Sequence, residues 1–133
     1  MLNLQIVTPE RKVFDATVDS VTVPTASGEA GILPNHAPLV SALKPGVLSY
    51  AVGGNVERVA IGGGFVEVSG NKVSVLADAA ETAADVNVEA ARAEREAAEK
   101  ELASAINQPI ESTQHLRDQV EAANARLQLA AGK

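Results

Sequence analysis

The 133-residue chain contains no cysteine and no tryptophan, and its only aromatic side chains are Phe14, Tyr50 and Phe65. The absence of cysteine excludes a disulfide framework, a thiolate nucleophile and a thiolate metal site. The scarcity of aromatics argues against recognition of nucleic acid by base stacking. Any hydrophobic core must therefore be built almost entirely from valine, leucine, isoleucine and alanine.

Basic residues are also scarce. The 11 lysines and arginines stand against 17 aspartates and glutamates, which gives a net charge of −6. A chain with this charge repels a phosphate backbone, so we expect no nucleic-acid partner. No hydrophobic run is long enough to span a membrane, and residues 1–6 lack the basic and apolar regions of a signal peptide. These features predict a soluble protein of a reducing compartment that reaches a membrane only through protein partners.

Residues 1–84 have the period-2 alternation of β-strands, as at Leu2, Leu4 and Ile6. Glycine and asparagine at 53–55 and 70–71 tolerate the positive φ that tight hairpin turns require. Many short strands with frequent turns are typical of an antiparallel β-sandwich or barrel, which we predict for this segment. The other short β-rich runs are Val21–Val23, Val47–Val52, Val56–Ile61, Phe65–Val68 and Val73–Leu76.

Residues 85–133 are rich in alanine and carry charges at helical spacing. We expect Asn87 to cap a first helix that has Glu89 in its first turn and runs to about Asn107, before Pro109. A second helix is expected from near Ser112 to Gly132. Together they predict a helical hairpin of marginal stability, because alanine faces bury little area. The expected apolar stripes are Val88, Ala91, Ala98, Leu102 and Ala105, interrupted by Arg95, and then Leu116, Val120, Ala123, Leu127 and Ala130.

The residues that could carry catalysis do not converge. His36 and His115 lie in different halves of the chain, which makes a two-histidine metal site improbable. The glycines at 62–64 lack the Lys-Ser/Thr ending of a phosphate loop and precede a strand, so we expect a β-bulge or close backbone packing there. None of the serines has the context of a nucleophile elbow. We therefore predict a protein that is not an enzyme on its own and that holds no metal.

The segment Gly28–Leu39 concentrates glycine and proline around one acidic residue, Glu29, and one histidine, His36. So many conformationally restricted positions indicate a loop of defined shape. One interpretation is a tight turn between strands, with His36 satisfied by nearby backbone. The other is a loop that presents Glu29 and His36 for contact function on a rigid scaffold.

Several segments, taken in chain order, resemble those of one known family. They are Val7–Phe14, Val21–Pro24, Gly28–Leu39, Lys44–Gly46, Gly62–Val68, Val75–Asp78 and the alanine-rich hairpin. Over essentially its whole length the chain resembles the epsilon subunit of bacterial and chloroplast F-type ATP synthases.

The resemblance implies a sandwich of about ten strands over residues 1–84, followed by a regulatory two-helix domain over residues 85–133. It implies a non-catalytic central-stalk (rotor) subunit whose sandwich binds the gamma subunit and the c-subunit ring. There it would couple proton flow to ATP synthesis, peripherally on the cytoplasmic face of a bacterial plasma membrane or thylakoid, or on the stromal face of a chloroplast thylakoid. It places Glu29 and His36 at the contact with the c ring and gamma.

In the family the hairpin extends along gamma toward the alpha and beta catalytic subunits and inhibits ATP hydrolysis. Basic residues of the second helix contribute to that inhibition. The candidates here are Arg117 and Arg126, with terminal Lys133, opposed by Asp118 and Glu121. The resemblance therefore implies a regulatory hairpin, while the acidic neighbours of its basic residues oppose electrostatic inhibition in this chain.

Some bacterial relatives bind ATP on the folded hairpin through an Ile/Leu-Asp-x-x-Arg-Ala motif. Without a gap, the matching positions are Val86–Ala91, which lack both the aspartate and the arginine. A two-residue shift makes Glu89 and Arg92 the candidate ATP-binding residues. Because capping by Asn87 explains the same residues without a ligand, we expect no nucleotide cofactor.

A second class of function is a free-standing nucleotide-sensing or adaptor module with the same two parts. Co-purification separates the two hypotheses. A tight one-to-one complex with a long coiled-coil gamma partner favours the rotor subunit, and a stable solitary monomer favours the free-standing module.

Overall fold

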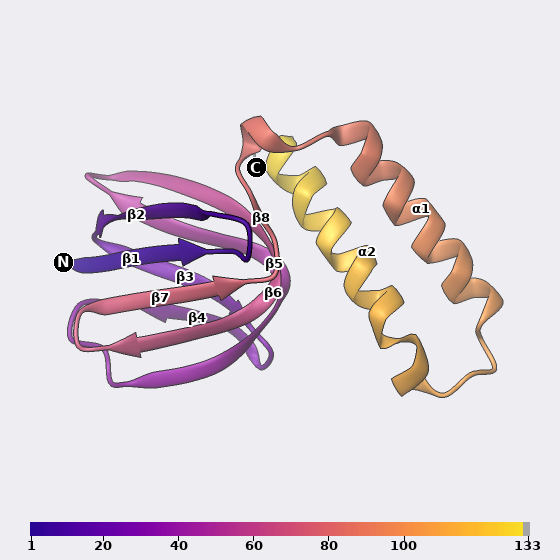
Figure 1. Cartoon of the computed structure of the whole chain (residues 1–133), viewed down its shortest axis with the longest axis horizontal. Coiled ribbons are helices and arrows are strands. Elements are labelled where there is room, and N and C mark those ends of the chain that lie inside the picture. Colours follow the sequence, from indigo (N-terminus) through magenta and orange to yellow (C-terminus); the bar gives the residue numbers. More distant parts are fainter. Residues whose placement is uncertain (132–133) are drawn as a thin grey trace.

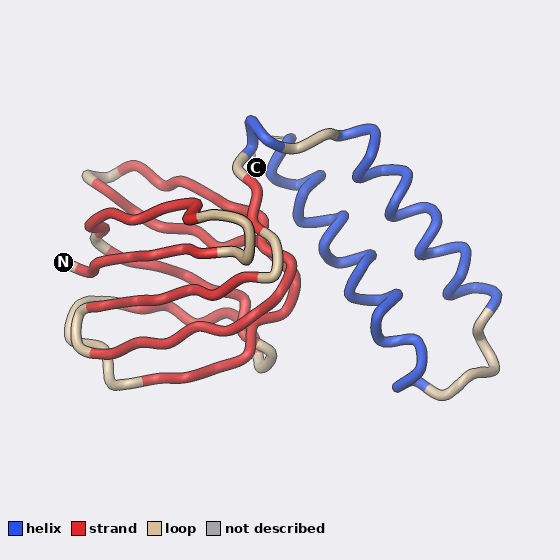
Figure 2. Tube along the Cα trace, viewed as in Figure 1, coloured by secondary structure: helices blue, strands red, loops and turns tan. Residues whose placement is uncertain are grey.

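In a computed structural model that describes residues 1–131, a β-sandwich is followed by two antiparallel helices (Figures 1 and 2). The fold class predicted from the sequence is confirmed. The elements, in chain order, are β1 (Leu2–Val7), β2 (Lys12–Val18), β3 (Ser20–Thr25), β4 (Gly28–Ile32), β5 (Leu39–Val52), β6 (Asn55–Ser69), β7 (Lys72–Ala77), β8 (Ala80–Glu81), a 3-10 turn η1 (Ala83–Asp85), α1 (Val88–Ser104) and α2 (Ile110–Ala130).

The strands pair in the order β2-β1-β7-β6-β5-β3-β4, and β8 adds to β6. One pairing departs from the predicted antiparallel arrangement, since β1 runs parallel to β7 from Asn3, opposite Lys72, to Val7, opposite Leu76. Figure 1 shows β1 lying between β2 and β7. The N-terminal strand is thus held on both sides.

The strand count differs from the predicted ten for a physical reason. Three predicted short strands, Val47–Val52, Val56–Ile61 and Phe65–Val68, belong to only two long strands, β5 and β6, which pair along nearly their full length. Each long strand curves through the fold, as Figure 2 shows, so the middle of β6, at Ala60 and Ile61, pairs with β8, and its C-terminal part, from Gly64 to Ser69, pairs with β7. Within residues 1–131 there are eight strands, and counting each long strand twice gives ten.

The bend in β6 depends on the glycines at 62–64. Gly63 and Gly64 have φ of 109° and 132°, a region that other residues rarely adopt. A Cβ at Gly64 would lie 2.0 Å from the carbonyl oxygen of Leu76, so the neighbouring strand occupies the space of any side chain there. The expected close backbone packing is therefore confirmed at this position.

Alternation along the strands builds the sandwich core. Leu2, Leu4 and Ile6 of β1 are fully buried, and Val73 and Val75 of β7 lie beside them. The two-residue turn at Gly53 and Gly54 has positive φ at both positions, as a tight hairpin requires. Local pattern thus placed both the core residues and this turn correctly.

The two helices form the predicted hairpin with shifted ends. Helix α1 ends at Ser104 instead of Asn107, and α2 begins at Ile110, directly after Pro109. Pro109 supplies the N-cap position with a fixed φ, which is why the second helix starts before Ser112. The predicted stop at Gly132 lies outside the described residues. Asn87 caps α1 as expected, with its side chain accepting a hydrogen bond from the Ala90 amide at 3.0 Å.

Helix α2 packs on β5 and β6, so it has two buried faces (Figure 1). Leu116 and Ala123 belong to the predicted stripe. Ala125 and Leu129 form a second face, which packs with Ala60 of β6. The sequence pattern predicted one stripe because the docking of the hairpin on the sandwich is a tertiary contact that no periodicity records.

Candidate protein-contact site

Glu29 lies on β4, the last strand at one edge of the sheet, opposite Pro24 of β3. Its side chain is exposed and lines a cleft of about 400 Å³ between the sandwich and α2. Lys44 of β5 and Glu121 of α2 line the same cleft. A carboxylate in this position is available to a partner from outside the chain, close to the docked hairpin.

The loop after β4 has a defined shape. Asn35 takes a left-handed conformation with φ of 66°, and its amide donates to the side-chain oxygen of Asn71 at 2.9 Å. The His36 amide donates to the Leu33 carbonyl at 3.2 Å. The ring Nδ1 of His36 lies 2.6 Å from the carbonyl oxygen of Ala37, and since a carbonyl only accepts, Nδ1 donates.

Glu29 and His36, the two predicted contact residues, lie beside different parts of the chain. Glu29 faces the cleft beside α2, whereas the His36 loop meets the β6–β7 turn at Asn71. His36 bonds to backbone of its own loop, as the tight-turn interpretation requires, and its ring is only partly buried. Their assignment to an intersubunit contact stays a prediction.

An exposed apolar patch lies on the outer surface of β5, β6 and β7. Phe65 is paired with Ala42 on one side and Leu76 on the other, so the three side chains form a row across three strands. Phe65 is 58% exposed, Leu76 57% and Val40, two residues from Ala42, 71%. We call Val40, Ala42, Phe65 and Leu76 the outer apolar patch.

Sequence reasoning missed this patch. Residues 65–68 are Phe-Val-Glu-Val, so the next residue along β6 on the same face as Phe65 is Glu67. Because Val66 and Val68 are buried, alternation turns Phe65 outward. The charge at Glu67 was the signal in the sequence that this face of the strand is exposed. That Phe65 lies beside Leu76 depends on the register between β6 and β7, which the sequence does not show.

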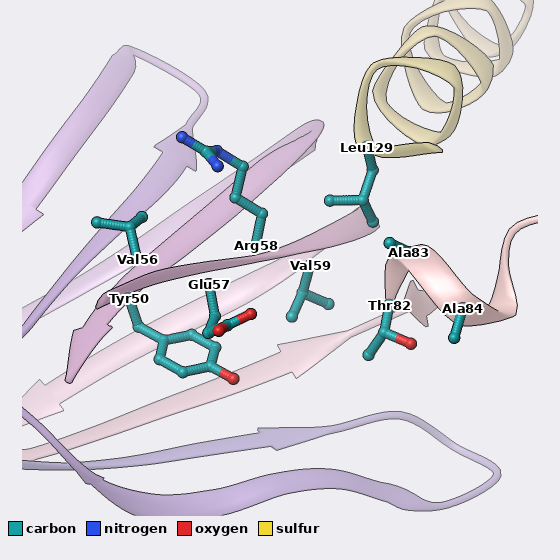
Figure 3. A pocket seen from close by; sticks show the side chains of 9 residues that line it. All are labelled: Tyr50, Val56, Glu57, Arg58, Val59, Thr82, Ala83, Ala84 and Leu129. Carbon is teal, nitrogen blue, oxygen red and sulfur yellow. The ribbon is translucent and has the colours of Figure 1, made fainter. Parts of the chain in front are cut away.

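A groove of about 320 Å³ lies between the β5–β6 hairpin, the residues after β8 and the end of α2 (Figure 3). Burial, with the nearby Glu57 carboxylate, raises the pKa of the Tyr50 hydroxyl. Arg58 points away from Glu57 across the strand, as Figure 3 shows. The groove therefore presents no converging acid, base and nucleophile.

The link between sandwich and hairpin is ordered by Asp85. Its carboxylate accepts from the amide of Thr82 at 3.1 Å and from the Thr82 hydroxyl at 3.0 Å. Arg11, from the β1–β2 loop, adds an ion pair at 3.4 Å. The hydrogen bonds from Thr82, and then Arg11, hold the pKa of Asp85 below its ordinary value.

The two arginines predicted as inhibitory contacts are both engaged inside the chain. Arg117 donates within its own helix, to the Thr113 hydroxyl at 2.7 Å and the Ile110 carbonyl at 2.7 Å. Arg126 reaches other elements, Glu81 of β8 and Glu94 of α1. A role for either in inhibition stays a prediction.

The candidate ATP-binding pair lies at the start of α1. Glu89 stands in the first turn, where a negative charge suits the helix dipole, and it is exposed. Arg92 is exposed and lines a shallow cavity of about 360 Å³ with Arg95 and Leu127. ATP binding at these residues stays untested.

Two further features bear on the kind of site. Among residues 1–131, no group of three or more histidine, cysteine, aspartate or glutamate side chains is placed to hold a metal ion. Neither α1 nor α2 is long and apolar enough to cross a bilayer. What the surface offers is an apolar patch, a shaped loop and a docked hairpin.

Such a surface, on a sandwich with a hairpin attached, is typical of proteins that contact other proteins. The family described as the beta-sandwich domain of the ATP synthase delta/epsilon chain matches residues 1–83. The chain belongs to this family. The match ends two residues after β8, before the helical hairpin begins.

Relatives named ATP synthase epsilon chain match the same part of the chain. That of Desulfitobacterium hafniense is 53% identical over 77 residues, which is 58% of each chain. That of Carboxydothermus hydrogenoformans is 54% identical over 79 residues, or 59% of each chain. The matched segment thus spans less than two thirds of each of these relatives.

Solved structures share the fold. A chain in a mitochondrial ATP synthase assembly of Euglena gracilis, containing OSCP, F1 and the c-ring, aligns with a TM-score of 0.77. The alignment covers 98% of this chain and 81% of that one at 22% identity, so the hairpin is included. A chain from the central stalk and c-ring of Tetrahymena thermophila aligns with a TM-score of 0.55 at 19% identity, over 65% of this chain and 69% of that one.

Proposed function

We propose that this chain is a non-catalytic central-stalk subunit of an F-type ATP synthase. Its sandwich binds the gamma subunit and the c ring and couples proton flow to ATP synthesis. The subunit is peripheral to the membrane, on the side that carries the catalytic alpha and beta subunits, and its hairpin restrains ATP hydrolysis.

The outer apolar patch carries this proposal. Val40, Phe65 and Leu76 are each more than half exposed. Exposing this apolar surface to water is unfavourable in free energy, and a tightly bound partner would remove that penalty. The hairpin does not cover these residues. The gamma subunit, as the permanent neighbour of such a sandwich, is the partner we assign to this patch.

Glu29 and His36 are proposed as c-ring contacts. Glu29 is exposed on an edge strand, and the hydrogen bonds of Asn35 and His36 fix the neighbouring loop. A loop whose shape is set before binding loses less conformational entropy when a partner binds. This suits a contact that must transmit torque.

The proposal is tested first by co-purification with gamma. We expect Phe65→Asp to abolish the one-to-one complex because it buries a charge in the contact. The matched control is Val56→Asp, on the same strand, where Val56 is 52% exposed outside the patch. If Phe65→Asp leaves the complex intact while the chain is folded, the patch is not the gamma contact.

The regulatory part is tested by deletion of residues 86–133 from the assembled complex. We expect hydrolysis to rise while coupled synthesis is retained. Unchanged hydrolysis would remove the inhibitory role of the hairpin and leave the coupling role standing.

We propose further that the hairpin binds no nucleotide. Asn87 caps α1 and Glu89 serves its first turn, so both have structural roles without a ligand. A calorimetric titration with millimolar ATP should therefore be flat. Micromolar binding that Arg92→Ala abolishes would overturn this expectation.

A further inference from the structure

One arginine joins three separate elements. Arg126 extends from α2, and its Nη1 donates to Glu94 of α1 at 2.8 Å. Its Nε lies 2.6 Å from Oε1 of Glu81, on β8. The Nε hydrogen is not directed at that oxygen, so this contact is an ion pair without a well-formed hydrogen bond.

The position of Arg126 distinguishes it from ordinary surface charges. Its side chain is only 17% exposed, against 29% for Glu81 and 61% for Glu94. Ion pairs that are partly removed from water are screened less by salt than exposed ones. Loss of one partner would leave the other partly buried and uncompensated.

The apolar contact beside it is small. The buried residues between hairpin and sandwich are Ala60, Ala125 and Leu129, with Val47 and Val86 partly buried around them. Two of the three are alanines, which remove little apolar area from water. The charge contacts of Arg126 are therefore a large share of what holds α2 in place.

We propose that Arg126, through Glu81 and Glu94, is a clamp that holds the helical hairpin on the sandwich and sets the fraction of molecules in which it is docked. The contact with Glu81 secures the hairpin to the sandwich, and the contact with Glu94 keeps α1 against α2. The clamp belongs to the isolated chain and goes beyond the rotor function, so its test needs no other subunit.

The test measures the distance between the two parts in the full-length chain. Because the chain has no cysteine, spin labels are placed at Ser69→Cys on the sandwich and Lys100→Cys on α1, both exposed positions. Pulsed electron spin resonance should give one narrow distance for the otherwise unchanged chain. Arg126→Gln should add a second, broader population, with the undocked-to-docked ratio raised roughly tenfold.

Matched variants decide the interpretation. Arg117→Gln removes the same charge from the same helix, but the Arg117 bonds stay inside α2, so the single distance should persist. Glu81→Gln should undock the hairpin as Arg126→Gln does, which settles the matter should Arg126→Gln fail to fold. Glu94→Gln should have a smaller effect, since Glu94 is more exposed.

The clamp is overturned if Arg126→Gln and Glu81→Gln both keep the single distance. It is also overturned if Arg117→Gln undocks the hairpin as much as Arg126→Gln, because the cause would then be net charge. Because the Arg126 side chain is largely removed from water, raising the salt concentration should leave the single distance of the unchanged chain nearly unaltered.

Discussion

The sandwich and the hairpin are built from the same few residue types and are stabilised very differently. The sandwich buries leucine, isoleucine and valine completely, as at Leu4, Ile6 and Leu48. The buried positions of the hairpin are mostly alanines, and Leu116 and Leu129 are its two buried leucines among residues 88–130. Burial of apolar area therefore stabilises the sandwich, while helix caps, small alanine contacts and ion pairs stabilise the hairpin.

The largest effect that would sharpen this contrast is expected at Gly64. In Gly64→Ala the new methyl group would meet the Leu76 carbonyl at 2.0 Å, in a backbone conformation with φ of 132°. We expect a loss of about 4 kcal/mol or more in the unfolding free energy of the sandwich, measured by denaturant titration. The matched control is Gly31→Ala, where nothing lies within 4 Å of the new Cβ. A small loss at both positions would show that β6 can shift away from β7.

Next in size is a pair of equal truncations, one in each part. Leu4→Ala should cost about 3–5 kcal/mol, because Leu4 is fully buried in a close-packed core. Leu116→Ala should cost about 2 kcal/mol, because its alanine-rich surroundings can close around the gap. When unfolding is followed by circular dichroism, Leu4→Ala should lower the stability reported by the strand signal. Leu116→Ala should lower the stability reported by the helix signal alone. Equal costs would break the contrast between the two parts.

A smaller effect is expected at the start of α1. Asn87→Ala removes the side-chain acceptor of the Ala90 amide and should destabilise the hairpin by about 1 kcal/mol. Hydrogen exchange of the first-turn amides of α1 measures this directly, with Asn107→Ala as a control outside both helices. Unchanged protection in Asn87→Ala would contradict the capping role.

The smallest effect concerns pH at the link. The pKa of Asp85 is lowered in the folded chain, so its contribution is fully present above the ordinary aspartate pKa, 3.8. That contribution is lost as the pH falls through the lower, folded value. Asp85→Asn should therefore flatten the acid side of the stability profile slightly, in thermal unfolding between about pH 2 and pH 5. A profile identical to that of the unchanged chain would mean that the contacts of Thr82 and Arg11 with the Asp85 carboxylate do not stabilise the fold through its negative charge.

The sequence predicted what depends on neighbours in the chain. Alternation identified Leu2, Leu4 and Ile6 as core residues, and residue type identified the turn at Gly53–Gly54 and the cap at Asn87. Each of these depends on a few consecutive residues, so propensity and pattern were sufficient.

What the sequence did not predict depends on contacts across the fold. The parallel pairing of β1 with β7, the outer apolar patch and the second buried face of α2 all require register or docking between distant segments. The Arg126 clamp belongs to the same group, since Glu81, Glu94 and Arg126 come from three elements. Fold class and core thus follow from local physics, while the candidate site follows from tertiary structure.

The parallel pairing of β1 with β7 also orders events during synthesis. β1 leaves the ribosome well before β7 and can form a hairpin with β2, but its second neighbour, which begins at Lys72, is made much later. Closing so long a loop is slow, and until it closes one side of β1 offers free amides and carbonyls to other nascent chains. The sandwich therefore completes only after β7 has emerged, just before the hairpin that docks on it is made.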